Sequence, residues 1–145
     1  MKTNIHIIAL KVAFLIGFVV SSDSYADIWV VSSSNSNIVS LSKEQCQFIW
    51  LGELDAVDGY RVIVADQFTS SKVRTRFYWL VARMDQEELR AHWAKKVFTS
   101  GRFPPESVSD DFAVIEWVKK EKNRLGYIDS KSYIDGLKVL YVIKE

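Results

Sequence analysis

The sequence predicts an α/β fold in which helices flank a mostly parallel sheet, and two observations lead to it. Short apolar runs of strand length alternate along the chain with longer segments in which apolar residues repeat at helical spacing. The helical segments open on serine or aspartate, which are good caps for helix N-termini. Strands that alternate with helices are typical of domains in which helices cover the faces of a sheet.

The first 26 residues predict a cleaved secretory signal. Lys2 and Lys11 precede or border an apolar run, residues 12–20, that is too short to span a bilayer. Residues 24–26 place small side chains at the two positions that a signal peptidase reads, so cleavage is expected after Ala26. A retained membrane anchor is the alternative interpretation.

The remaining segment, residues 27–145, has the length of one compact domain, expected in the periplasm. It carries 17 basic and 17 acidic residues, and this neutral balance argues against nucleic acid as a partner. Cys46 is the single cysteine, so the domain has no internal disulfide. Its place in a helical segment predicts a buried thiol, whereas a reactive thiol is the alternative.

The first half of the domain predicts a strand, a helix and a second strand. The strand at residues 27–32 leads into a Ser/Asn loop, in which Ser33 and Ser34 either turn the chain or donate to a ligand. A capping box opens at Ser42, and the helix that it starts is expected to end at Gly52. A polar turn then leads to the second strand, residues 61–65.

The stretch that follows this strand, residues 66–71, is here called the elbow, and it connects the strand to a helix expected to end near Arg83. A strand that enters a helix through a polar loop presents unbonded backbone N–H groups and the positive end of the helix dipole, which together suit an anion. The candidate ligands are Thr69, Ser70 and Ser71. The alternative is that these hydroxyls only cap the helix.

The second half predicts two helices and two strands. A capping box at Asp85 starts a helix whose apolar stripe is Leu89, Trp93 and Val97. Ser109 is expected to cap the fourth helix. Its expected apolar residues are Phe112, Val114, Ile115 and Val118, with Trp117 at the edge. The last two strands are expected at residues 126–128 and 139–143.

Four segments, in order, resemble the phosphate-type substrate-binding proteins of bacterial ABC importers, whose fold is the type 2 periplasmic binding protein. They are LSKEQCQFIWLG at residues 41–52, the elbow, WAKKVFTSGRFPP at residues 93–105, and the pair formed by residues 113–118 and 125–128. Members of that family have two lobes that close on the ligand. The resemblance concerns the second lobe and implies a short, single-lobe form.

The resemblance implies that the elbow holds a small oxyanion such as phosphate, with Ser70 at the place of a family serine. It also places Asp66 where the family has an arginine, Ser71 where it has a glycine and Lys72 where it has a threonine. Asp66 is therefore included among the candidate ligands, yet its charge is expected to weaken phosphate binding. Arg74 and Arg76 are expected to point outward into solvent.

We expect a binding protein with no cofactor and no metal, whose partners are an oxyanion and either a membrane transporter or a second copy of the chain. The alternative is a non-enzymatic interaction or scaffold protein that kept the lobe and lost the small ligand. An enzyme is not expected, because His92 is the only histidine of the domain and the sequence has no metal-ligating His/Cys set.

Overall fold

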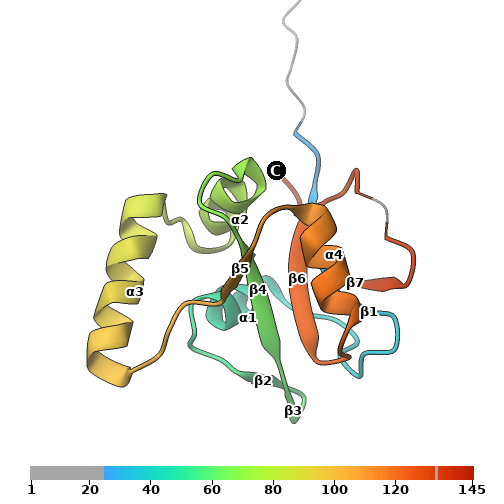
Figure 1. The fold of residues 1–145 in the computed structure, drawn as a ribbon, viewed down its shortest axis with the longest axis horizontal. Coiled ribbons are helices and arrows are strands. Elements are labelled where there is room, and N and C mark those ends of the chain that lie inside the picture. Colours follow the sequence, from blue (N-terminus) through green and yellow to red (C-terminus); the bar gives the residue numbers. More distant parts are fainter. Residues whose placement is uncertain (1–24, 133) are drawn as a thin grey trace, which may run out of the picture.

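The computed structural model describes residues 25–132 and 134–145, so nearly all of the predicted signal segment lies outside the described residues. Figure 1 shows the order of the elements along the chain. They are β1 (Ile28–Ser33), α1 (Lys43–Trp50), β2 (Ala56–Val57), β3 (Tyr60–Arg61), β4 (Ile63–Gln67), α2 (Lys72–Ala82), α3 (Gln86–Ser100), β5 (Glu106–Val108), α4 (Asp111–Lys119), β6 (Arg124–Asp129) and β7 (Leu137–Ile143). Within these residues, no helix is long and apolar enough to cross a membrane.

The main sheet has five strands in the order β5-β4-β6-β1-β7. Strand β4 runs parallel to both β5 and β6, and β1 runs antiparallel to both β6 and β7. Four of the five strands therefore point in one direction, and β1 alone points the other way. The mostly parallel α/β sheet predicted from the sequence is confirmed.

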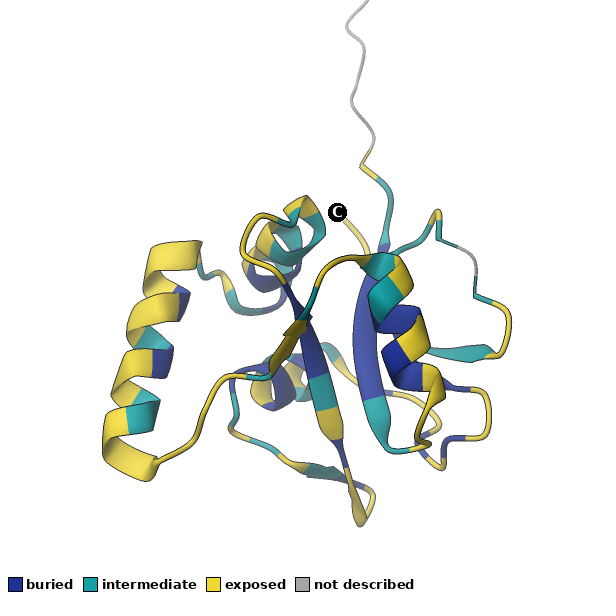
Figure 2. Cartoon of the chain, in the orientation of Figure 1, coloured by how far each residue is buried: buried dark blue, intermediate teal, exposed yellow. Residues whose placement is uncertain are grey.

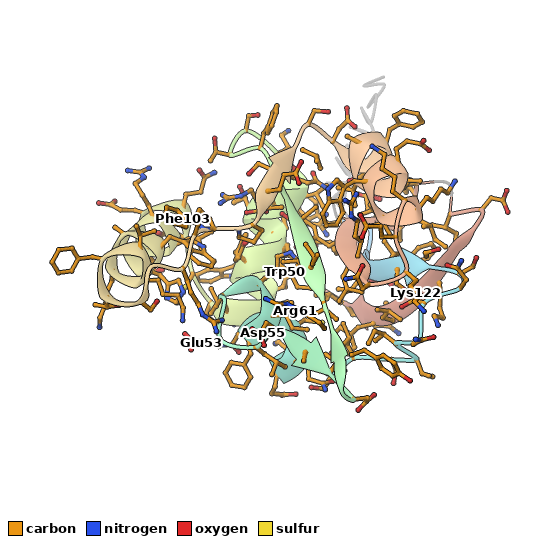
Figure 3. The ribbon with its side chains drawn as sticks, turned by 60° about the horizontal axis from the view of Figure 1, so that its bottom comes forward. Trp50, Glu53, Asp55, Arg61, Phe103 and Lys122 are labelled. Atoms are coloured by element: carbon orange, nitrogen blue, oxygen red, sulfur yellow. The ribbon has the colours of Figure 1, made fainter. Side chains whose placement is uncertain are left out.

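Helices cover both faces of this sheet and bury a separate core on each. On one face, α1 and α2 pack on side chains of β1 and β6 that include Val30 and Tyr127. On the other face, α4 packs on the alternate residues of the same strands, including Val31 and Ile128. This division follows from the alternation of side chains along a strand. At the centre of the first core, the Trp50 indole lies between α1 and β4 and donates to the Ala65 carbonyl at 3.0 Å (Figure 3).

The capping signals in the sequence are confirmed at two helices and corrected at a third. Ser42 and Gln45 form the capping box of α1, and Asp85 and Glu88 form that of α3. The cap of α4 is Asp110 rather than Ser109, since the Asp110 carboxylate accepts the backbone N–H of Ala113 at 2.9 Å.

The apolar face of α4 is also rotated from the expected one. Trp117 is buried, at 7% exposure, whereas Phe112 is 72% exposed. The face toward the sheet is set by Val114 and Val118, which close on Gly126 of β6. At about 100° per residue, Phe112 lies about 200° from Val114 around the helix and therefore points away from the sheet.

Three short strands were missed in the sequence because two or three residues show no periodicity. The expected polar turn is a β-hairpin, with β2 and β3 joined by Asp58 and Gly59. Both of these residues have positive φ, as a two-residue hairpin turn requires. The other missed strand, β5, follows Pro105 and pairs with β4 at the edge of the sheet.

Helix α3 stands to one side of the sheet and is exposed along most of its surface (Figures 1 and 2). Its inner side is held by the segment that follows α1. The His92 ring nitrogen Nε2 lies 2.9 Å from the Leu51 carbonyl oxygen, and Lys96 forms an ion pair of 2.8 Å with Glu53. The Trp93 ring packs on Gly52, so the stripe predicted on this helix does face the domain.

Gly52 provides a test of this attachment. Its φ is +68°, and a Cβ at this position would lie 2.7 Å from Cη2 of Trp93. The left-handed backbone alone should cost Gly52→Ala about 1–2 kcal/mol of unfolding free energy. Displacement of the Trp93 ring should cost about 1–3 kcal/mol more.

The matched control is Gly59→Ala, because Gly59 has a φ of +82° with no atom within 4 Å of the added Cβ. Urea unfolding of both variants measures the difference. Equal losses of stability would show that the packing of Trp93 on Gly52 contributes nothing.

Candidate functional site

The elbow lies at the carboxyl end of β4, where α2 begins. Strand β4 continues through Gln67, so the loop between strand and helix is shorter than predicted and consists of residues 68–71. Because β4 and β5 are parallel, the N-termini of α2 and α4 lie at the same end of the sheet, which is the top in Figure 1. In parallel α/β sheets ligands bind at this end.

Ser71 is used inside the protein. It is the N-cap of α2, and its hydroxyl accepts the backbone N–H of Arg74 at 3.1 Å. The same hydroxyl donates to Oε1 of Gln67 at 2.6 Å. The capping interpretation of the elbow therefore holds for Ser71.

Asp66, the first residue of the elbow, is buried at the end of β4, at 3% exposure, with four donors on its carboxylate. One oxygen accepts the Gln67 backbone N–H at 2.8 Å and the Tyr127 hydroxyl. The other accepts Nε of Arg74 and the hydroxyl of Tyr78, both at 3.0 Å. This buried arrangement of Asp66, Arg74, Tyr78 and Tyr127 is here called the Asp66 network.

The Asp66 network corrects two expectations from the sequence. Arg74 does not point outward: it is 11% exposed and forms an ion pair with Asp66. The negative charge of Asp66 is therefore balanced locally and does not stand at the elbow as an uncompensated repulsion to anions. A buried carboxylate persists only when paired and hydrogen-bonded in this way.

Both tyrosines of the Asp66 network remain neutral phenols far into the alkaline range. Burial, and then the negative charge of Asp66, raise the pKa of Tyr78 well above its ordinary value. Burial raises the pKa of Tyr127 well above its ordinary value as well, again with Asp66 as the next cause. The phenols therefore act as hydrogen donors to Asp66 and carry no charge of their own.

The start of α4, beside the elbow, already holds carboxylates. Asp110 caps the helix, and Asp111 accepts from the Asp129 backbone N–H at 2.9 Å and from the Ser132 hydroxyl at 2.6 Å. Asp111 also accepts the side-chain amide of Gln67 at 2.7 Å. The positive end of the α4 dipole is therefore occupied by the protein's own negative charge.

The start of α2 differs, because its first turn holds no acidic residue. The two exposed hydroxyl residues of the elbow, Thr69 and Ser70, line a hollow of about 540 Å³. Lys72 and Arg76 contribute cations to this hollow, here called the elbow hollow. Arg76 is paired with Asp129 and Glu145, and Glu145 also lines the hollow, whereas Lys72 makes none of the ion pairs found in the described residues.

Ser33 and Ser34 lie at the opposite end of the sheet. Ser33 ends β1 and Ser34 follows it. Because β1 runs antiparallel to β6, Ser32 pairs with Leu125 near the start of β6. The Ser33 hydroxyl donates to the side chain of Asn35 at 2.6 Å, and the Ser34 backbone N–H donates to the Gly136 carbonyl at 3.0 Å. The structure therefore does not bring these two serines to the elbow. The reason is that β1 runs antiparallel to its neighbours, which the sequence did not indicate.

The remaining candidate groups have structural environments. Cys46 is buried, and burial raises the pKa of its thiol to about 12, so it stays protonated near neutral pH. His92 bonds the Leu51 carbonyl, as described above. Among the described residues, no cluster of three or more His, Cys, Asp or Glu side chains is placed to hold a metal ion.

The fold, unlike the sequence, is similar to those of known proteins. No protein-family model and no curated protein sequence matches the chain. Several solved structures match its fold. The fold is similar to that of phosphate-binding proteins of ABC transporters.

One similar structure is that of a protein named as a phosphate ABC transporter substrate-binding protein, from Clostridium perfringens, with bound phosphate. It is 17% identical with a TM-score of 0.64, and the match covers 81% of this chain and 45% of that chain. An ABC-type phosphate transport receptor from Vibrio cholerae gives the same identity and TM-score, with 81% and 46% covered. PstS from Borrelia burgdorferi matches at 17% identity with a TM-score of 0.55, covering 74% and 42%.

The described chain therefore matches slightly less than half the length of these receptors, as one of their lobes would. The resemblance found in the sequence is confirmed at the level of the fold, and at this identity the likeness establishes the fold alone. The residues that bind a ligand have to be argued from this chain's own geometry.

Sequence reasoning missed the groups that surround the elbow. Gln67 connects Ser71 to Asp111, and Tyr127 reaches Asp66 from β6, although both are distant in sequence from what they contact. The sequence did not show the order of the strands in the sheet, which places β6 beside β4 and so brings these residues together. A signal for Arg74 was present, since a buried aspartate requires a cation, and Arg74 lies in the first turn of the helix that follows the strand of Asp66.

Removal of the charge at the centre of the Asp66 network tests whether it stabilises the fold. Asp66→Asn leaves Arg74 buried without a partner, and breaking a buried ion pair in this way costs about 3–5 kcal/mol of unfolding free energy. The matched control is Asp55→Asn, which removes an exposed pair of 3.7 Å with Arg102 and should cost at most about 1 kcal/mol. If the urea midpoints of Asp66→Asn and Asp55→Asn fell by the same amount, the Asp66 network would not stabilise the fold more than an exposed ion pair does.

Alkaline unfolding tests the two buried phenols. The unfolded phenol ionises near pH 10, whereas the folded one, with its raised pKa, does not, so the unfolded state releases protons first. The stability that these groups contribute is complete below about pH 10 and is lost as the pH rises toward the folded pKa.

Tyr78→Phe should therefore reduce the fall of unfolding free energy above pH 10, by up to about 1.4 kcal/mol per pH unit. Tyr60→Phe, at an exposed phenol, is the control and should leave the slope unchanged. The measurement is urea unfolding at several pH values between 9 and 11. A wild-type slope in Tyr78→Phe would mean that the phenol ionises equally in both states.

Proposed function

We propose that this chain is an exported, phosphate-type substrate-binding domain that holds a small oxyanion weakly in the elbow hollow. The observation that carries the proposal is the start of α2. It is the one helix start among α1 to α4 without an acidic residue in the first turn, and Lys72 stands at its first position. The dipole and the cation act on the same small volume, beside Thr69 and Ser70.

The fold adds support, because the elbow is at the end of the sheet where ligands bind in open parallel sheets. The C. perfringens protein with the similar fold was solved with phosphate. Asp66 no longer argues against an anion, since Arg74 balances its charge. The affinity that we propose is about millimolar, because one cation, two hydroxyls and a helix N-terminus replace the arginine of the resembled family.

The signal predicted in residues 1–26 places the domain in the periplasm in this proposal, and a membrane transporter is its proposed partner. The similar proteins are named for ABC transport, and the chain matches less than half of each, so a transport role is proposed here and not inferred from the fold.

A second candidate function, an interaction module without a small ligand, is favoured by one observation. Phe68 follows β4 and Phe112 is in the first turn of α4. Both are exposed at the end of the sheet that carries the elbow, at 49% and 72%. Exposed aromatic side chains of this kind serve well as anchors for a protein partner. A partner protein or a second copy of the chain would then cover this end of the sheet.

A phosphate titration separates the two functions. We expect the backbone amide resonances of Ser70, Ser71 and Lys72 to shift with a dissociation constant of about 1 mM for inorganic phosphate. Lys72→Gln should weaken binding about ten-fold, because it removes the cation of the hollow that has no ion partner among the described residues. Ser70→Ala should weaken it less.

The control is Lys43→Gln, which removes a lysine from the same first position of α1, where Glu44 follows. Equal weakening in both lysine variants, or no shift of the three amides at about 20 mM phosphate, well above the proposed dissociation constant, would overturn the proposal and favour the interaction module.

A further inference from the structure

A second cavity, of about 440 Å³, lies between α3 and the edge of the sheet formed by β5. Its volume is in the range of small-molecule sites. Helix α3, which forms one side of the cavity, stands to one side of the sheet (Figure 1) and contacts the segment after α1 through His92 and Lys96. Thr69 and Gln86 line both this cavity and the elbow hollow, so the two are neighbours with different walls.

One wall of this cavity is apolar. It consists of Leu89, Trp93 and Val97, the stripe that the sequence predicted on this helix. Leu89 and Trp93 are buried, and Val97 is half-buried. Pro104, from the connection to β5, adds apolar surface. Such a wall stabilises a bound apolar group by removing its surface from water, and it contributes no binding free energy to a hydrated inorganic ion.

Trp93, a residue of this wall, also carries a buried hydrogen-bond donor. Its indole Nε1 is buried and donates to no acceptor among the described residues, although the side chain is only 7% exposed. Buried indole N–H groups are ordinarily bonded, and an unbonded one calls for an acceptor. The benzo end of the ring lies against Gly52, and the pyrrole end, which carries Nε1, lies closer to its own helix.

Two arginines supply positive charge to the same cavity. Arg74 uses Nε to bond Asp66, and none of the hydrogen bonds among the described residues involves its two Nη groups. Arg90 takes part in no ion pair of the described residues. Asp66, the acidic residue of the lining, is balanced by Arg74, so the lining carries one net positive charge. Guanidinium groups bond carboxylates well because their donors match the two oxygens.

We propose that this cavity binds a small organic monocarboxylate with an apolar body. The carboxylate pairs with Arg90 and the Nη groups of Arg74, and the apolar body packs on Leu89, Trp93 and Val97. The site is separate from the oxyanion site proposed at the elbow, and it selects by its apolar wall, which inorganic phosphate cannot use.

Phenylacetate is a suitable probe because it combines one carboxylate with one apolar ring. Titration into uniformly ¹⁵N-labelled protein should shift the indole N–H resonance of Trp93, which Trp93→Phe identifies by its disappearance. Arg90→Gln should weaken phenylacetate about ten-fold or more, as the loss of a charge-assisted hydrogen bond predicts. Phenylacetamide, which has the same ring and no charge, should bind about ten-fold more weakly or not at all.

Lys95→Gln is the matched control, since Lys95 is an exposed cation of the same helix that does not line the cavity. It should leave phenylacetate binding unchanged. The proposal is overturned if phenylacetate leaves the Trp93 indole resonance in place at tens of millimolar, or if Arg90→Gln and Lys95→Gln weaken binding equally.

Inorganic phosphate is titrated in parallel as the arm for the elbow site, and it should move the amides of Ser70 and Lys72 but not the Trp93 indole. Each ligand therefore reports on its own site, and failure at one leaves the other result intact.

Discussion

Four hydrogen-bond donors converge on the carboxylate of Asp66, two on each oxygen, and they come from three different elements. Gln67 belongs to β4, Arg74 and Tyr78 belong to α2, and Tyr127 belongs to β6. Because the carboxylate is buried, none of these donors can be replaced by water without cost. The Asp66 network therefore fixes the angle at which α2 leaves the sheet, and the position of the elbow depends on it.

That constraint decides which residues of the elbow remain available. Ser71 and Gln67 are bonded to each other and, through Gln67, to Asp111 at the start of α4. Thr69, Ser70 and Lys72 remain exposed on the outer side. The carboxylate of Asp66, which would repel an anion, is paired with Arg74 inside the protein. Lys72, which would attract an anion, lies on the outer side of the same loop and lines the hollow.

Helix α3 creates a different kind of surface, because little of it is used to build the core. Its attachment to residues 51–53 consists of the Trp93 ring and the polar contacts of His92 and Lys96. As a result, α3 leaves a cavity with an apolar wall, and the Trp93 indole N–H has no acceptor among the residues that the structure describes. A closely packed helix would have left neither feature. The fold therefore offers two neighbouring sites of distinct chemistry, one polar and one amphipathic.

The sequence by itself determined the four helices, the longer strands and the fold class, since apolar periodicity and capping residues such as Ser42 and Asp85 act over a few residues and can be seen locally. It also identified the elbow, and the resemblance to phosphate-type binding proteins agreed with the fold. Only the tertiary structure decided the sites, because strand direction and strand order are set by packing between distant residues. The reversed direction of β1 separated Ser33 and Ser34 from Ser70, and the neighbouring strands brought Tyr127 and Asp111 to Asp66 and Gln67. No local sequence pattern predicts contacts between such distant residues, because these contacts follow from the order of the strands in the assembled sheet.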